Sequence, residues 1–289
     1  MQNQDIKEYL ARTGIVKISR LDTALLEAFG EEEGGRHIER LDELFGRSEE
    51  RLLYGTGDTI YLHRQEELVE YLNQNLRMSL LAASFYDRVF FKRAAEYLLK
   101  QDSFFAGDIF DMGCGNGILT CFLALQHPDS SVTGLDLSPG AVRVARELAG
   151  KIELQNVRFM PTGETICEHE DAAPQELPGM CDTLFSCRTA HENAAWRPLC
   201  EEAGGAALSA KEQERRHGQY AQVLSALLKP RGYLVSVERY EDDSAYEGLL
   251  HALERQEIWQ VKGTHMQFSC KSGDGTGTFQ AAVFQKIPT

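Results

Sequence analysis

The sequence lacks the patterns that mark several large classes of protein. Its seven cysteines are scattered without C-x-x-C spacing, which argues against a zinc site or a disulfide framework and favours a reducing compartment. It has no run of about 18 apolar residues, and its first residues form no apolar signal region. We therefore expect a cytoplasmic protein with no membrane segment and no structural metal.

Positive charge is also scarce. The chain has 30 basic against 44 acidic residues, a formal net charge of -14. The most basic stretch, "KEQERRH" at 211–217, mixes both signs, so no patch is expected to offset the repulsion of a phosphate backbone. With 289 residues, 43% of them hydrophobic, the chain is long enough to bury a full core. These numbers predict an ordinary globular protein and argue against nucleic acid as its partner.

The pattern of apolar residues changes near residue 101. Before it, apolar residues recur at helical spacing at 5–13, 21–29, 38–45, 65–74 and, as one long amphipathic stretch, at 78–100, with "EEEGGR" at 31–36 expected to interrupt the helices. After it, short apolar runs alternate with amphipathic helices, which is typical of βαβ units and a parallel sheet. We therefore divide the chain into an N-terminal helical region, 1–100, and an α/β domain, 101–289.

The expected strands of the α/β domain lie at 108–113, 131–137, 157–161, 181–187 and 232–238. The last residues, 265–286, contain "GDGTG" between two strand-like runs, which predicts an antiparallel hairpin. The polar segment from Trp196 to about His217 is longer than a usual connection, so we expect a lid or an insertion there.

The stretch "DIFDMGCGNG" at 108–117 places glycine at Gly113, Gly115 and Gly117. Glycine permits positive φ and lets another molecule approach the main chain, so a ligand is expected to bind against this turn. The dinucleotide fingerprint is G-x-G-x-x-G, and here the third glycine comes one position early, with Ile118 in its place. The spacing is therefore a poor match to a nicotinamide site.

Two acidic residues accompany this turn. Asp111 comes near the end of the first strand, and Asp136 ends the second strand, 19 positions after Gly117, where an acid typically binds a ribose diol. Ser138 and Pro139 then form a suitable N-cap and first position for the next helix.

These residues resemble the class I S-adenosylmethionine-dependent methyltransferases. "DMGCGNG" is similar to the first motif of the family, "GLDLS" to the acidic second motif, "TGE" to the third and "LLKPRGYLV" to the turn into the fifth strand, where Arg231 replaces a more usual glycine. The resemblance covers about 101–289 and implies a Rossmann-like sheet of seven strands, mostly parallel, with helices on both faces and an antiparallel last strand. It also implies S-adenosyl-L-methionine as the cofactor.

The same resemblance assigns roles to individual residues. Asp111 would lie near the amino group of the cofactor, Asp136 would hold its ribose hydroxyls and Leu137 would pack on adenine. The full set of implied cofactor-binding residues is Asp111, Gly113, Cys114, Gly115, Asn116, Gly117, Asp136, Leu137, Gly163, Glu164, Thr165 and Cys187. Because Cys114 has no basic neighbour in sequence, we interpret its thiol as a small group packed behind the turn, not as a nucleophile.

Candidate catalytic residues follow the fourth strand in "LFSCRTAHENAAW". His191 is a candidate general base for a hydroxyl substrate, with Glu192 beside it, because an imidazole accepts a proton at neutral pH. Arg188 is a candidate for binding a substrate carboxylate, and Tyr86 for lining the substrate pocket. For His191 the alternative is a capping or solvent-facing residue, and for Arg188 it is a surface salt bridge.

Motifs that the sequence lacks narrow the range of possible methyl acceptors. No Asn-Pro-Pro-Tyr or Asp-Pro-Pro-Tyr follows the fourth strand and no Pro-Cys pair occurs, so the arrangements used on exocyclic base amines and on cytosine C5 are absent. We expect transfer to an oxygen or nitrogen of a small molecule. A methyltransferase acting on a protein or RNA, and a catalytically silent cofactor-binding protein, remain alternatives. The N-terminal helices either cover the cofactor and line the substrate pocket, or residues 1–75 form a partner-binding module or a homodimer interface.

Overall fold

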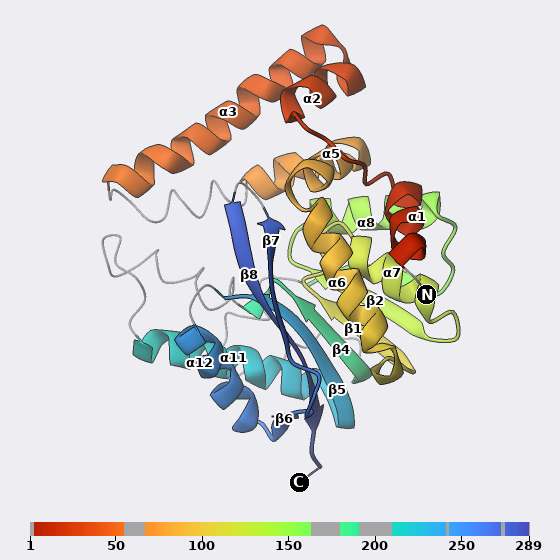
Figure 1. Ribbon diagram of the computed structural model, residues 1–289, viewed down its shortest axis with the longest axis vertical. Helices are drawn as coiled ribbons and strands as arrows, with labels where there is room; N and C mark the ends of the chain where they lie inside the picture. The colour runs from red at the N-terminus through yellow and green to blue at the C-terminus, as the bar shows by residue number, and fades with distance from the viewer. Residues whose placement is uncertain are drawn as a thin grey trace.

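The computed structural model describes residues 3–54, 67–162, 180–190, 210–240, 243–272 and 275–288. They form an α/β structure in which a central sheet is flanked by helices on both faces (Figure 1). Four of the five expected strands of the α/β domain are observed within about a residue of their predicted limits. The predicted fold class is confirmed.

The described part of the sheet has eight strands in the order β3-β2-β1-β4-β5-β8-β6, with β7 paired to β8. The neighbours from β3 to β5 are parallel, whereas β8 is antiparallel to β5, β6 and β7. The strands are β1 Asp108–Met112, β2 Ser131–Asp136, β3 Val157–Pro161, β4 Cys181–Cys187, β5 Leu228–Arg239, β6 Ile258–Gln260, β7 Met266–Ser272 and β8 Gly275–Lys286. The strand order reverses between β1 and β4, the position where open α/β sheets bind ligands.

The described sheet has eight strands where the resemblance implies seven, and the difference lies at one edge of the sheet. The outer side of β8 is paired with β6 near Lys286 and with β7 from Ala281 to Gly275, so two short strands occupy one edge position. Between them the chain leaves the sheet in a turn at Gly263, whose φ is 80°. The β7–β8 pairing is the terminal hairpin that the sequence predicts.

The helices form two groups on opposite faces of the sheet (Figure 1). One face is covered by α1, α6, α7 and α8, and the other by α11 and α12. None of the described helices combines the length and the apolar composition that crossing a membrane requires. The helices are α1 Asn3–Thr13, α2 Leu21–Phe29, α3 Glu31–Tyr54, α5 Leu76–Tyr86, α6 Arg88–Lys100, α7 Ile118–Gln126, α8 Pro139–Lys151, α11 Ala210–Leu227 and α12 Asp243–Glu254, with a 3-10 turn at Asp102–Phe104 and helical residues at 67–72.

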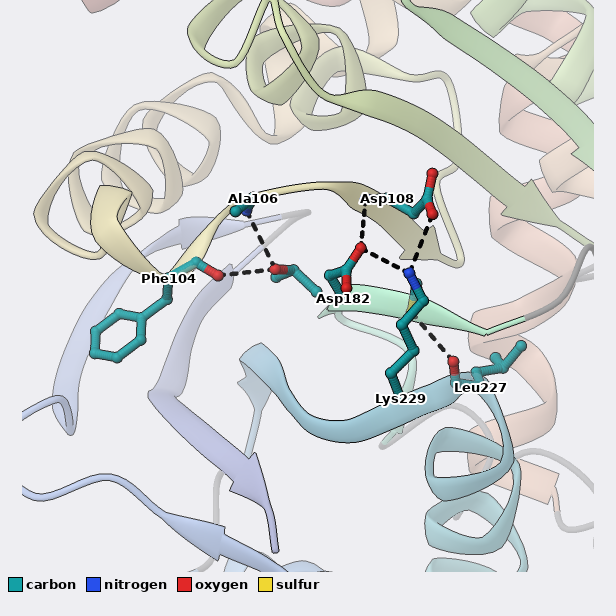
Figure 2. A network of polar contacts seen from close by, with 8 residues as sticks. Phe104, Ala106, Asp108, Asp182, Leu227 and Lys229 are labelled. Carbon is teal, nitrogen blue, oxygen red and sulfur yellow. Dashed lines mark hydrogen bonds and ion pairs between the residues drawn. The ribbon is translucent and has the colours of Figure 1, made fainter. Parts of the chain in front are cut away.

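A polar network fixes the amino-terminal ends of the central strands (Figure 2). The ammonium group of Lys229 lies 2.8 Å from Asp182 Oδ2 and 3.2 Å from Asp108 Oδ2, and Asp182 Oδ2 also accepts a hydrogen bond from Asp108 N. The hydroxyl of Thr183 donates to the carbonyl of Phe104 over 2.8 Å. These contacts join β1, β4 and β5 at the end opposite to the glycine turn, and so help to set the register that places their carboxyl ends side by side.

The N-terminal helix α1 packs directly on the α/β domain. Tyr9 Oη donates to the carbonyl of Ile118 at the start of α7, and the guanidinium of Arg12 donates to the carbonyl of Ile152 over 2.7 Å. Ile6, Tyr9 and Leu10 are buried in the same hydrophobic core as α6, α7 and α8. Residues of both predicted regions therefore contribute to one core.

Two helix limits differ from those predicted. The glycines Gly34 and Gly35 do not interrupt the helix, because α3 begins at Glu31 and runs through them. A Cβ at Gly34 would lie 2.8 Å from the carbonyl oxygen of Leu25, so glycine here allows α3 to approach α2 closely. The stretch 78–100 forms two helices instead of one, because the chain turns at Asp87, with φ -121° and ψ 6°.

The predicted lid or insertion at 196–217 is described only from residue 210 onward. From there the chain is helix α11, and His217 within it is only 2% exposed. The last part of the predicted insertion is therefore a helix packed on the sheet. Residues 196–209 lie outside the described part of the chain.

Candidate functional site

The glycine turn joins the carboxyl end of β1 to α7. All three glycines have positive φ, 73° at Gly113, 51° at Gly115 and 78° at Gly117. A Cβ at Gly117 would lie 2.8 Å from the Cβ of Ala145 in α8, whereas a Cβ at Gly115 would meet no atom within 4 Å. Gly117 therefore allows α7 and α8 to pack closely, whereas Gly115 faces open space that a ligand can use.

Asp111 is the most unusual acid in this region because it is buried and only half satisfied. It is 1% exposed; its Oδ2 accepts a hydrogen bond of 2.5 Å from Thr120, and its Oδ1 has no hydrogen-bond partner among the described residues. Burial raises the pKa of Asp111 to about 7, the negative charge of Asp136 adds to this shift, and the hydrogen bond from Thr120 opposes it. A cationic group bound beside Oδ1 would satisfy this oxygen and stabilise the carboxylate.

Asp136 lies across the turn at the carboxyl end of β2. Its Oδ2 accepts a hydrogen bond of 2.7 Å from Gly115 N, and its Oδ1 accepts one of 2.9 Å from Ser138 N. Burial raises its pKa, while these two hydrogen bonds oppose the shift. The structure thus brings Asp136 and the glycine turn into direct contact, as their positions at adjacent strand ends predict.

Ser138 caps α8 as predicted, with Pro139 as the first helical residue. Its hydroxyl oxygen accepts a hydrogen bond of 3.0 Å from Ala141 N. Between Asp136 and this cap, Leu137 is 49% exposed, an unusual exposure for a leucine that borders a buried strand end. Its position suits an apolar contact with a flat ligand.

Cys114 is buried behind the turn, and Cys187 is half-buried at the end of β4. A Cβ at Gly134 in β2 would lie 3.0 Å from Cys114 Sγ, and burial raises the pKa of both thiols. The interpretation of Cys114 as a small packing group therefore agrees with its position. Asn116 Nδ2 donates over 3.2 Å to the hydroxyl of Ser79 in α5, so the turn also contacts the N-terminal region.

The residues predicted to contact substrate lie at the end of β4 and on α5. Arg188 has a left-handed backbone, with φ 58°, and its Nη1 lies 3.1 Å from Asp87 Oδ1. Its guanidinium also lies over the ring of Phe90, 5.2 Å from the centroid. Tyr86, at the end of α5, packs edge-on against Phe85. Arg188 therefore has an intramolecular ion pair, and its contact with a substrate stays a prediction.

The remaining predicted site residues lie outside the described part of the chain. They are Gly163, Glu164 and Thr165 of the third motif and the catalytic candidates His191 and Glu192. Their assigned roles stay predictions.

Sequence reasoning missed a buried acid at the end of β5. Glu238 is 0% exposed; its Oε1 accepts a hydrogen bond of 2.5 Å from the hydroxyl of Ser186, and its Oε2 accepts one of 3.0 Å from Ala190 N. The Ser186 hydroxyl is also 2.8 Å from Tyr220 Oη. Glu238 thus fixes the chain just before His191. The available signal was an acid at the end of the apolar run "GYLVSVE", the same signal that identified Asp136.

The comparison with known families agrees with this geometry. The family model described as "Methyltransferase domain" matches residues 109–202, which include the glycine turn and Asp136. The chain therefore contains a stretch that is similar to methyltransferase domains. It extends well beyond the match, so the N-terminal helices and the last strands are additional to the part that the family model recognises.

Two curated methyltransferases are similar to parts of this chain. The release factor glutamine methyltransferase of Vibrio cholerae is 35% identical over 68 residues, 24% of each chain. The trans-aconitate 2-methyltransferase of Rhodococcus jostii is 33% identical over 102 residues, which are 35% of this chain and 40% of that enzyme. The chain thus spans about a quarter to two fifths of the length of these relatives. The solved structure of N-methyltransferase NodS from Bradyrhizobium japonicum is 14% identical, covers 70% of this chain and 99% of its own, and has a TM-score of 0.46.

The described residues of the matched stretch fit the cofactor S-adenosylmethionine. S-Adenosylmethionine has an amino group, a ribose diol and an adenine ring. The unpartnered Oδ1 of Asp111 suits the amino group, and the remaining acceptor capacity of Asp136 suits the diol. The space beside Gly115 leaves room for the ligand to approach the main chain.

Proposed function

We propose that the protein is an S-adenosylmethionine-dependent methyltransferase that transfers a methyl group to an oxygen or nitrogen atom of a small molecule. The observation that carries this proposal is the buried carboxylate of Asp111, whose Oδ1 has no partner among the described residues and lies beside a glycine turn that faces open space. A buried unpaired acceptor is unfavourable unless a ligand satisfies it. The methyltransferase domain matched at 109–202 supports the choice of ligand.

The proposed reaction makes modest demands on the protein. The methyl group of the cofactor is bonded to a positively charged sulfur, which is a good leaving group, so transfer is an in-line displacement. The protein needs mainly to align the nucleophile and to exclude water. The ends of β4 and β5 are joined through Ser186 and Glu238, which fixes the chain as far as Ala190.

The choice of a small-molecule acceptor rests on charge and on the relatives. A net charge of -14 disfavours a nucleic acid. Of the two curated relatives, the one matched over the longer stretch is named for trans-aconitate, a small carboxylate, and the other for a release factor, a protein. Carboxylates, phenols and amines therefore come first in a screen for the acceptor.

Equilibrium binding tests the cofactor. Calorimetry with the full chain is expected to detect S-adenosylmethionine and S-adenosylhomocysteine at micromolar concentrations, and not NAD, because the glycine spacing differs from the dinucleotide fingerprint. Asp136→Ala is expected to weaken binding by about 1 to 3 kcal/mol, since a buried hydrogen-bond partner is lost. Asp129→Ala, at an exposed aspartate just before the amino end of the same strand, is the matched control.

Two results would count against the proposal. If neither adenosyl ligand bound the wild-type chain, the cofactor assignment would be wrong. If Asp136→Ala and Asp129→Ala bound equally well, Asp136 would not contact the ribose. Once binding is established, homocysteine release after enzymatic cleavage of S-adenosylhomocysteine serves as the readout for the acceptor screen.

A further inference from the structure

Residues of the N-terminal region reach the proposed cofactor site. The helical residues 67–72 and the turn that follows them lie over the start of α8, which begins at Pro139, shortly after Asp136. The carbonyl oxygens of Asn73 and Gln74 accept hydrogen bonds of 3.0 and 3.2 Å from Arg143 Nη2 in α8. Ser79 Oγ donates to Asn73 Oδ1 over 3.0 Å and accepts from Asn116 in the glycine turn. This region therefore contacts both the first and the second motif.

The contact nearest to Asp136 is made by Glu70. Its Oε1 accepts a hydrogen bond from the hydroxyl of Ser138, the residue that caps α8. The carboxylate thus lies at the amino end of α8, where the helix dipole favours negative charge. Its charge also acts on Asp136: burial is the main cause of the raised pKa of Asp136, and Glu70 raises it further.

Gly140, the second residue of α8, provides the space for this contact. A Cβ at Gly140 would lie only 2.5 Å from Glu70 Oε2 and 3.4 Å from the carbonyl oxygen of Asn73. Its φ is not in the left-handed region, so the backbone itself does not require glycine here. A side chain at position 140 would therefore displace the Glu70 carboxylate, which is the far end of a flexible side chain.

We infer that Glu70 is a positioning residue of the cofactor site. Glu70 holds Ser138 and the chain before it in place for ligand binding, and it thereby couples the docking of residues 67–79 to the bound cofactor. This inference rests on the proposed function. Asp136 and Leu137 stand between the ligand and Ser138, so a ligand that orders them also orders the partner of Glu70. Coupling of this kind is reciprocal, because each contact stabilises the state that the other needs.

The experiment compares Glu70→Ala and Glu70→Gln with Glu67→Gln in the full chain, using S-adenosylhomocysteine as the probe. Glu67 is the matched control because it lies one helical turn earlier and pairs with Arg40 rather than with α8. Glu70→Ala is expected to weaken probe binding about two- to tenfold, the range for one partly exposed hydrogen bond. Glu70→Gln retains an acceptor for the Ser138 hydroxyl and is expected to recover most of the affinity, whereas Glu67→Gln is expected to match the wild type.

A second variant displaces Glu70 without removing it. Gly140→Ala places a methyl group against Glu70 Oε2 and also raises the helix propensity of α8. We expect it to weaken probe binding as Glu70→Ala does, while the melting temperature of the ligand-free protein is unchanged or higher. Loss of affinity without loss of stability separates a positioning role from a general folding defect.

Limited proteolysis measures the coupling directly. In the wild type, saturating S-adenosylhomocysteine is expected to slow tryptic cleavage after Arg77 at least threefold, and this protection is expected to be lost in Glu70→Ala. If the wild type bound the probe but Glu70→Ala and Gly140→Ala bound it equally well with full protection, this inference would be wrong and the proposed function would stand. Failure of the wild type to bind the probe would refute both.

Discussion

Replacing Asp111 by asparagine tests the electrostatics of the site through protein stability alone. The carboxyl group is 1% exposed and its pKa is raised to about 7, against a usual value of about 4 in an unfolded chain. Between these two pH values the folded protein keeps the proton that the unfolded chain loses. The contribution of Asp111 to stability is therefore fully present below about pH 4 and is lost as the pH rises to about 7. A shift of about three units corresponds to about 4 kcal/mol.

The Asp111→Asn side chain carries no charge at any pH, so the variant lacks this electrostatic penalty. Its amide group still accepts a hydrogen bond from Thr120, but it leaves an N–H without a partner, which destabilises the protein by a roughly constant amount of about 1 to 3 kcal/mol. The pH dependence is thus the informative quantity. Relative to the wild type, the free energy of unfolding of Asp111→Asn is expected to gain about 3 kcal/mol between pH 5 and pH 8.

Urea denaturation of both proteins at half-unit steps from pH 5 to pH 8 measures this difference. Asp129→Asn, the same change at an exposed position, is expected to show no pH-dependent difference from the wild type. A constant difference between Asp111→Asn and the wild type across this range would show that Asp111 is already ionised in the folded protein, and the buried-acid account would fail.

The same group links ligand binding to pH. If the cationic amino group of the ligand binds beside Asp111, binding needs the ionised carboxylate. The affinity of the wild type for S-adenosylhomocysteine is then expected to rise as the pH increases from 5.5 to 7, by up to about tenfold per unit, and to level off above that value. Calorimetry of Asp111→Asn is expected to show weak binding without this dependence.

Three further predictions concern other residues. Gly117→Ala is expected to lose about 2 to 4 kcal/mol of stability in urea denaturation, because its φ is positive and the new methyl group clashes with Ala145. Gly115→Ala is expected to lose only about 1 kcal/mol of stability, but to bind the ligand more weakly in calorimetry. Burial lowers the pKa of His217 to about 4. Its contribution to stability, about 3 kcal/mol, is therefore lost as the pH falls from about 6.5 to 4. Over this range the urea midpoint of His217→Gln is expected to fall less than that of the wild type. Arg231→Gly is expected to raise the free energy of unfolding by up to about 1 kcal/mol, because Arg231 has φ 68°.

Local sequence patterns determined the elements whose structure depends on neighbours in the chain. The alternation of apolar runs predicted β1, β2, β3, β4, α7 and α8, and Ser138 with Pro139 predicted the start of α8. The glycine turn and Asp136 were also predictable, because both stand at strand ends that a parallel sheet brings to one edge. These features follow from side-chain periodicity, capping and backbone conformation, which act over a few residues.

Only the tertiary structure decided the features that depend on distant contacts. Gly34 is predicted from sequence to interrupt a helix, but α3 runs through it, and its missing side chain allows α3 to approach α2 closely. The pattern of 78–100 does not show the turn at Asp87, where the N-terminal region changes direction. Glu70 is one of several similar glutamates in "QEELVEYL", and its contact with Ser138 exists only because two segments 68 positions apart are packed together. The sequence thus determined which residues stand at the strand ends, whereas packing decided which of the remaining acids reach them, because burial and pairing depend on the whole fold.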